Sequence, residues 1–141
     1  MRNFFITLAV SLLSAFSVAA HAADDSLFLA LGSKPGIASL MGDFVGRLKT
    51  DDRIGRYFKD VKPAALAESL TDQICKVSGG PCDYEGAPMN KAHQDLEIDR
   101  AAFNRLVEVL QDAMNAKGIA FGDQNRLLAR LAPMHRDIVT R

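Results

Sequence analysis

A Gly-Gly-Pro run at positions 79–81 most constrains how this chain can fold. Two glycines followed by a proline cannot continue a helix, so the helical pattern before them must stop there. The chain then crosses an irregular stretch and enters a segment at 89–96, where apolar residues return at helical spacing around His93. Long irregular stretches in small domains usually serve function. We therefore expect a site where this stretch meets the helices on either side.

Apolar residues on both sides of the break follow helical spacing, and no alternating strand pattern competes with them. Pro63 suits the first turn of a helix, and Asp99 and Asp123 are good helix caps. Pro133 should kink the last helix. The sequence therefore predicts an all-α fold. The helical segments are expected near 27–31, 37–48, 54–58, 63–77, 89–96, 99–114 and 123–138.

The first 22 residues are typical of a secretory signal peptide. Arg2 precedes a long apolar run, and Ala20-His21-Ala22 forms a small-x-small cleavage triplet. A membrane anchor is the competing interpretation because the run approaches spanning length. The serines within the run and the triplet favour cleavage. We expect residues 1–22 to be removed and one domain, 23–141, to be exported to the periplasm, with no membrane attachment after cleavage.

The charge balance and the number of histidines argue against several classes of function. The 17 basic and 17 acidic side chains balance, which gives no support for nucleic-acid binding. After cleavage only His93 and His135 remain, too few for a bare metal ion, and no serine or cysteine has a recognisable base. A haem differs because the porphyrin supplies four nitrogens and one histidine suffices. On spacing alone, however, His93 is better explained as an ordinary core or surface histidine.

Two cysteines, Cys75 and Cys82, bracket the Gly-Gly-Pro break. In an exported protein a pair of cysteines favours a disulfide, and the chain reverses between these two, so their side chains can meet. Two unpaired buried thiols are the alternative, and a thiolate ligand to haem is less favoured still. A disulfide here would pin the turn that leads to His93.

Several short motifs follow one another in a fixed order along residues 27–139. They are Phe44-Val45, Tyr57-Phe58, the Gly-Gly-Pro helix stop, and Tyr84-x-Gly86-x-Pro88-Met89-x-x-x-His93. This order resembles that of the group I truncated haemoglobins, the short globins of bacteria and protists. The resemblance implies a globin-like two-over-two helical sandwich, in which two antiparallel helix pairs enclose haem b. Residues 23–141 would then form a truncated globin domain.

The same resemblance implies which residues surround the haem. His93 becomes the ligand of the iron, and Phe58 becomes the aromatic side chain that lies against the haem face. Tyr84 is placed near the rim, and other apolar residues are divided between the distal and proximal sides. The candidate haem contacts are Phe44, Val45, Phe58, Leu66, Leu70, Ile74, Tyr84, Met89, Phe103 and Val107. Ile98 and Leu106 are also expected on the proximal side or at the haem edge.

The chain departs from better-known members of that family on the distal side. Val45 stands where a tyrosine is common, and Leu66 or Leu70 stands where a glutamine is frequent. A hydrogen bond to bound oxygen contributes about 1–3 kcal/mol, so its loss should speed oxygen release roughly tenfold or more. Gln73 is the only nearby donor, and helical spacing places it off the centre of the apolar stripe. We expect an apolar distal pocket.

The resemblance implies reversible binding of oxygen or another diatomic gas, nitric oxide and carbon monoxide included. A ligand-binding haem protein is favoured over an enzyme, and no catalytic residue is assigned. Nitric oxide-detoxifying or peroxidase-like chemistry at the same iron is the alternative, and it would need a redox partner. A haem-based sensor, or a helical module that keeps the globin shape without haem, also stays open.

Overall fold

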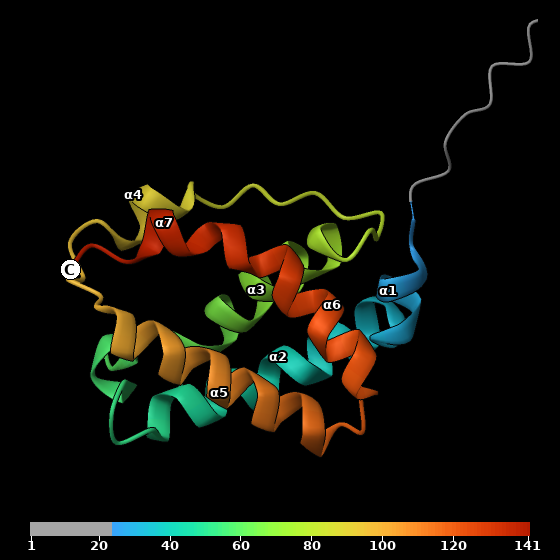
Figure 1. The fold of residues 1–141 in the computed structure, drawn as a ribbon, viewed down its shortest axis with the longest axis horizontal. Coiled ribbons are helices and arrows are strands. Elements are labelled where there is room, and N and C mark those ends of the chain that lie inside the picture. Colours follow the sequence, from blue (N-terminus) through green and yellow to red (C-terminus); the bar gives the residue numbers. More distant parts are fainter. Residues whose placement is uncertain (1–23) are drawn as a thin grey trace, which may run out of the picture.

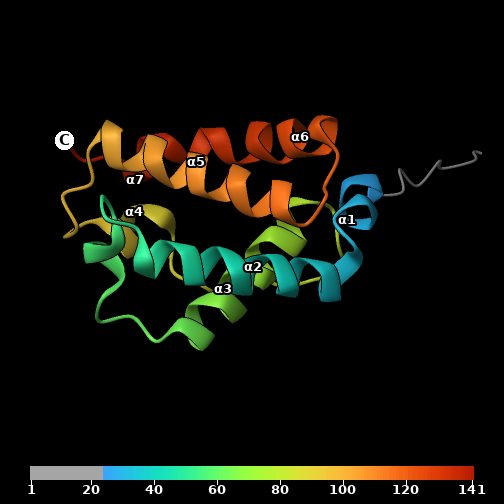
Figure 2. The same ribbon diagram turned by 90° about the horizontal axis from the view of Figure 1, so that it is seen from below.

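The computed structural model describes residues 24–141, and this part of the chain contains helices and no strand. Helices α2 and α3 form one layer, and α5 and α6 form the other (Figures 1 and 2). The helices are α1 Ser26–Ala30, α2 Ser33–Thr50, α3 Pro63–Val77, α4 Met89–His93, α5 Arg100–Ala116, α6 Phe121–Leu131 and α7 His135–Ile138, with 3₁₀ turns η1 Gly55–Phe58 and η2 Ala132–Met134. The predicted all-α, two-over-two fold is confirmed.

The predicted signal peptide at 1–22 lies outside the described residues. Within residues 24–141, no helix is both long enough and apolar enough to cross a membrane.

Helix α2 supplies the centre of the core and packs against both α3 and α5. Its apolar side chains follow the predicted helical spacing, and each is at most 4% exposed. Removing one leucine or isoleucine side chain from water stabilises the fold by about 1.5–3 kcal/mol. This face of α2 therefore contributes a large part of the stabilisation that comes from burying apolar side chains. The buried residues of α2 are Ile37, Leu40, Met41, Phe44, Val45 and Leu48.

The helix stop after α3 forms as predicted. The N–H of Gly80 donates to the Cys75 carbonyl at 2.8 Å and that of Gly79 to the Lys76 carbonyl at 3.1 Å. This paired bonding is the Schellman arrangement, and it needs a left-handed residue, here Gly79 at φ +94°. A Cβ at Gly79 would also collide with the backbone of Asp24. Only glycine therefore satisfies both the conformation and the space.

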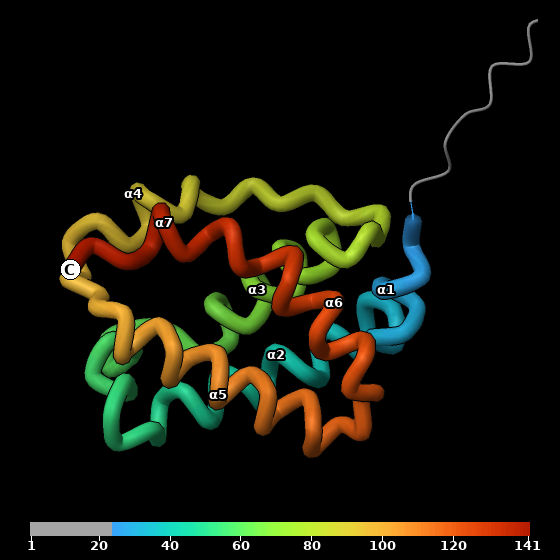
Figure 3. The backbone as a smooth tube through the Cα atoms, in the orientation of Figure 1, coloured from blue at the N-terminus to red at the C-terminus, as the bar shows by residue number. Residues whose placement is uncertain are grey.

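Beyond this stop the chain runs as an irregular segment from α3 to α4 (Figure 3). Helix α4 then packs against α7 near the C-terminus. The short helix that carries His93 therefore adjoins both the irregular segment that precedes it and α7, which are far apart in sequence.

The helix caps were predicted with mixed success. Asp99 caps α5 as expected, because its Oδ1 accepts the Ala102 N–H at 2.7 Å. The prediction that Asp123 caps the last helix is wrong, because α6 already begins at Phe121. Asp123 lies in the first turn instead, where its charge suits the helix dipole and pairs with Arg126 at 3.1 Å.

Pro133 interrupts the last helix as predicted. Helix α6 ends at Leu131, the 3₁₀ turn η2 contains the proline, and α7 resumes at His135. Proline removes a helical N–H and clashes with the preceding turn, which accounts for the break.

Candidate functional site

His93 ends the short helix α4 and is half-buried. Its Nδ1 lies 2.8 Å from the carbonyl oxygen of Met89, one turn earlier. A carbonyl only accepts hydrogen bonds, so Nδ1 carries a proton, and in the neutral ring Nε2 keeps its lone pair. Such a bond fixes both the ring orientation and the tautomer of a metal-binding histidine. His93 is thus prepared to coordinate through Nε2.

An apolar cavity of about 60 Å³ adjoins His93. Its lining comes from η1, α4, α5, α7 and the segments beside them, and it holds no charged side chain. A single histidine cannot hold a bare ion, and residues 24–141 contain no group of three or more metal-ligating side chains. An iron whose other ligands come from a porphyrin suits this lining. The lining residues are Ile54, Tyr57, Phe58, His93, Ile98, Ala102, Phe103, Leu106 and Ile138.

The structure brings only some of the predicted site residues together at this cavity. His93, Phe58 and Phe103 line it, as do the expected neighbours Ile98 and Leu106. Sequence reasoning did not assign Ile54, Tyr57, Ala102 or Ile138 to the site. Ile138 had a usable signal, since it belongs to the inward-facing pattern of the last helix.

The other candidates lie elsewhere. Phe44 and Ile74 belong to the main hydrophobic core, where α2 meets α3, and Leu70 packs against it. Val45 is fully buried on α2, whereas Leu66 and Val107 are half-buried. Their assignment to the haem stays a prediction, because none of these residues lines the cavity beside His93.

Tyr84 is packed within its own loop. Its ring covers Gly86, where any Cβ would collide with it, and its hydroxyl lies 3.5 Å from the Ala87 carbonyl oxygen. The side chain thus shapes the segment that leads to α4. A glycine at 86 is needed for this close approach.

Gln73 is more deeply placed than its spacing predicts. The side chain is buried at 8% exposure, and its Nε2 lies 3.6 Å from the Met89 sulfur and 3.7 Å from the Met134 sulfur. Thioether sulfur is a weak acceptor, so these bonds add little energy but set an orientation. Gln73 joins α3 to α4 and η2. No local pattern could reveal this, because the methionines are 16 and 61 residues away in sequence.

Cys75 and Cys82 form a disulfide, with their Cα atoms 5.8 Å apart. Cys75 is fully buried at the end of α3, and Cys82 packs against the core from the following loop. The bond spans the Gly-Gly-Pro break and so clamps the start of the segment that leads to His93. The sequence had left unpaired thiols open, and residues 24–141 contain no free cysteine.

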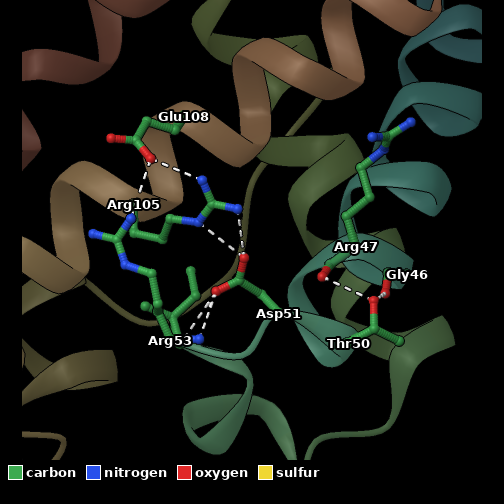
Figure 4. A network of polar contacts seen from close by, with 8 residues as sticks. Gly46, Arg47, Thr50, Asp51, Arg53, Arg105 and Glu108 are labelled. Atoms are coloured by element: carbon green, nitrogen blue, oxygen red, sulfur yellow. Dashed lines mark hydrogen bonds and ion pairs between the residues drawn. The ribbon is translucent and has the colours of Figure 1, made fainter.

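A polar network ties the turn between α2 and η1 to α5, and both this turn, through Ile54, and α5 contribute to the cavity (Figure 4). Arg105 places Nη2 at 2.8 Å from Asp51 Oδ2 and Nη1 at 2.8 Å from Glu108 Oε2. The N–H groups of Arg53 and Ile54 also donate to Asp51 Oδ1. The Arg105 hydrogen bond, aided by these N–H groups, holds the pKa of the Asp51 carboxyl below its usual value. The network fixes Ile54 against the first turns of α5.

Comparison with known proteins gives consistent matches. The family model for the bacterial-like globins matches residues 26–140. The group 1 truncated hemoglobin GlbN of a Nostoc strain is 25% identical over 116 residues, which cover 82% of this chain and 98% of the relative. The corresponding protein of Mycolicibacterium paratuberculosis is 25% identical over 115 residues, covering 82% and 85%.

Solved structures agree with the fold. The truncated hemoglobin of Tetrahymena pyriformis in its Fe(III) form superposes with a TM-score of 0.78 at 20% identity, covering 82% of this chain and 98% of that one. The 2/2 hemoglobin of a Synechococcus strain, in the cyanomet state with covalently attached heme, superposes with a TM-score of 0.76 at 21% identity over the same shares.

Proposed function

The chain belongs to the bacterial-like globin family, and from this we propose that it binds haem b through His93 and reversibly binds a diatomic gas on the other side of the iron. Haem is the cofactor of the globin family. The observation that carries the role of His93 is the bond between its Nδ1 and the Met89 carbonyl oxygen at the edge of an apolar cavity. That bond leaves Nε2 free for iron, as a proximal ligand requires.

The chemistry of the lining fits a haem, but the volume of the cavity is too small for one. Ligand pockets usually occupy about 300–1,000 Å³. The cavity beside His93 occupies about 60 Å³ and must widen. Helix α4 buries none of its residues, whereas α2 buries six and α5 four. We infer that α4 and the loop before it move outward to admit the haem, while the core helices stay in place.

The proposal includes an apolar environment for the gas. Val45 is buried on α2 and carries no hydrogen-bond donor, so a gas beside it would gain no stabilising hydrogen bond. Gln73 on α3 is a buried amide, and its donor already faces two methionine sulfurs. Oxygen should therefore leave quickly. The same reasoning disfavours an enzyme that must retain oxygen for reaction with nitric oxide.

Export to the periplasm is part of the proposal. The Cys75–Cys82 bond supports it, since disulfides persist in oxidising compartments and are rare in the cytosol. The leader-like composition of residues 1–22 supports it independently. Mass analysis of the protein recovered from periplasmic extracts tests both, through the position of the first residue and the state of the thiols.

The decisive experiment removes the proposed iron ligand. Purified protein reconstituted with haem should take up one equivalent and show an intense Soret band. His93→Gly should lose or shift that band, and added imidazole should restore it by entering the space left by the ring. The matched control is His135→Gly, because that ring is also half-buried and packs edge-on against Phe103 at 4.8 Å.

The control variant should keep the band of the unaltered protein. An unchanged spectrum in folded His93→Gly would remove His93 as the ligand. No haem uptake by the correctly folded unaltered chain would reject haem binding altogether. Turnover measurements with peroxide or nitric oxide on the loaded protein then separate gas binding from enzymatic chemistry.

A further inference from the structure

A second cavity lies next to the one beside His93, and its lining is basic. It has a volume of about 170 Å³ and lies between η1 and the first turns of α5. Ile54 and Ala102 line both cavities, so they share a wall. Three guanidinium groups and one carboxylate face the space, and of the three only Arg105 is tightly paired with carboxylates, those of Asp51 and Glu108. The lining residues are Arg53, Ile54, Arg56, Asp99, Ala101, Ala102 and Arg105.

The three arginines differ in how far they are already engaged. Arg105 spends its Nε and both terminal nitrogens on Asp51 and Glu108, at 2.8–2.9 Å. It therefore forms a fixed part of the wall. Arg53 makes only a loose ion pair of 3.5 Å with Glu108, and both side chains are more than half exposed (Figure 4). An anion of higher charge can displace such a pair at little cost.

Arg56 is the least engaged of the three. Among the described residues it forms no ion pair, and its guanidinium stacks 4.8 Å above the Tyr57 ring while donating to the Tyr57 hydroxyl at 3.0 Å. Stacking on an aromatic face holds the guanidinium plane and leaves its remaining N–H groups free to donate. Arg56 is thus oriented without being neutralised by a carboxylate at contact distance.

We propose that this cavity binds a small phosphate-bearing anion, held by Arg53 and Arg56 against the first turn of α5. A guanidinium fork matches two phosphate oxygens, so Arg53 and Arg56 can each direct N–H groups at the same anion. The N-terminus of the 17-residue helix α5 adds a favourable potential for an anion. Repulsion from Asp99 is limited because its Oδ1 is turned into the helix, where it accepts the Ala102 N–H.

This inference is separate from the proposed haem function. Neither Arg53 nor Arg56 lines the cavity beside His93, so the anion site can exist whether or not haem binds. The shared wall raises one alternative, which is that carboxylates of a bound haem reach the arginines. The test therefore uses haem-loaded protein, in which a haem carboxylate would already occupy the site.

The test is isothermal titration calorimetry at constant ionic strength. Haem-loaded protein is titrated with inorganic phosphate and, separately, with glycerol 3-phosphate, in sodium chloride buffer. We expect saturable binding of one equivalent. Tighter binding of inorganic phosphate assigns the free ion, and tighter binding of glycerol 3-phosphate assigns a small phosphate ester. Either result supports the site.

Variants then locate the binding. Arg56→Gln and Arg53→Gln should each weaken phosphate binding about tenfold or more, as expected for the loss of one charge-assisted hydrogen-bonding partner. Both side chains are exposed, so the variants should fold. Arg47→Gln is the matched control, because Arg47 pairs with Asp43 at 2.9 Å on α2 and points away from the Arg53–Arg105 cluster (Figure 4). It should bind phosphate like the unaltered protein.

Four outcomes would overturn the proposal. The first is that neither probe binds saturably, and the second is that chloride competes as strongly as phosphate. The third is that Arg47→Gln weakens phosphate binding as much as Arg53→Gln and Arg56→Gln do. The fourth is binding that haem-free protein shows but haem-loaded protein lacks. If the chain takes up no haem, the same titration on the folded protein still decides the anion site. Failure of the haem proposal and failure of this one are therefore distinguishable.

Discussion

Helices α2 and α4 differ in how far they are buried against the rest of the molecule. Helix α2 has 18 residues and buries six apolar side chains, whereas α4 has five residues and buries none. A helix as short as α4 has no stability of its own, because the cost of forming its first turn is not repaid. The histidine proposed to bind iron therefore sits on a helix that depends on its neighbours to stay in place.

Tethers, meaning bonds and contacts with neighbouring elements, hold α4 in place although none of its residues is buried. The Cys75–Cys82 bond fixes where its leading loop starts, Gln73 contacts Met89, and α7 packs alongside. Regions with few buried contacts open at low free energy, and ligand-binding segments are commonly drawn from them. The division suits a protein in which a stable core frames a wall that must open for a large cofactor.

The largest expected effect on stability comes from truncating a buried side chain of α2. Leu40→Ala removes a fully buried side chain from the core and should lower the free energy of unfolding by about 2–5 kcal/mol. Leu96→Ala, just beyond α4, is the control, since Leu96 is 38% exposed and should cost far less. Urea denaturation of the two variants measures both values. Equal losses would contradict the division between a stabilising core and a tethered wall.

Removing the disulfide should have the next largest effect. Cys75→Ser with Cys82→Ser should lower the free energy of unfolding by about 2–3 kcal/mol, because the open loop regains conformational freedom in the unfolded chain. Amide hydrogen exchange should rise in the segment from Cys82 to His93 and stay slow in α2. Chemical reduction of the unaltered protein should reproduce the pattern. Faster exchange throughout α2 instead would show that the disulfide supports the core rather than the tether.

The same contrast explains what the sequence alone could predict. Helix α2 follows its pattern because six apolar side chains repeat at helical spacing, and the stop after α3 follows from local glycine chemistry. Both depend on residues close together in the chain. The start of α6 was missed because Asp123 satisfies a first-turn position as well as a cap. Local chemistry could not separate these two placements.

The site was harder to predict because its contacts are long-range. Phe58, His93 and Phe103 were assigned to the site through the family resemblance, and all three line the cavity. Gln73 was placed at the edge of its helix, yet it is buried through methionines that arrive from distant segments. The basic cavity was not foreseen either, since its arginines look like ordinary surface charges until η1 meets α5.

A smaller effect should follow from adding a donor to the α2 side. In Val45→Tyr a phenol hydroxyl is introduced where the resemblance places the gas, and oxygen dissociation from the ferrous protein should slow roughly tenfold. Val45→Phe is the control, with nearly the same bulk and no hydroxyl. Both variants share a packing cost of about 1–3 kcal/mol at this buried position. Stopped-flow rates that are the same for both variants would remove Val45 from the wall that faces the gas.

The smallest effect should come from the tether at Gln73. Gln73→Leu keeps the volume of the side chain and removes an amide whose donor faces two weak sulfur acceptors, so the free energy of unfolding should change by less than about 1 kcal/mol. Exchange of the α4 amides should nevertheless quicken, and the exposed control Gln94→Leu should leave both quantities unchanged. A loss well above 2 kcal/mol would make Gln73 part of the core instead. The wall that carries His93 would then share its stability with α2, and the outward movement proposed for haem entry would have to begin elsewhere.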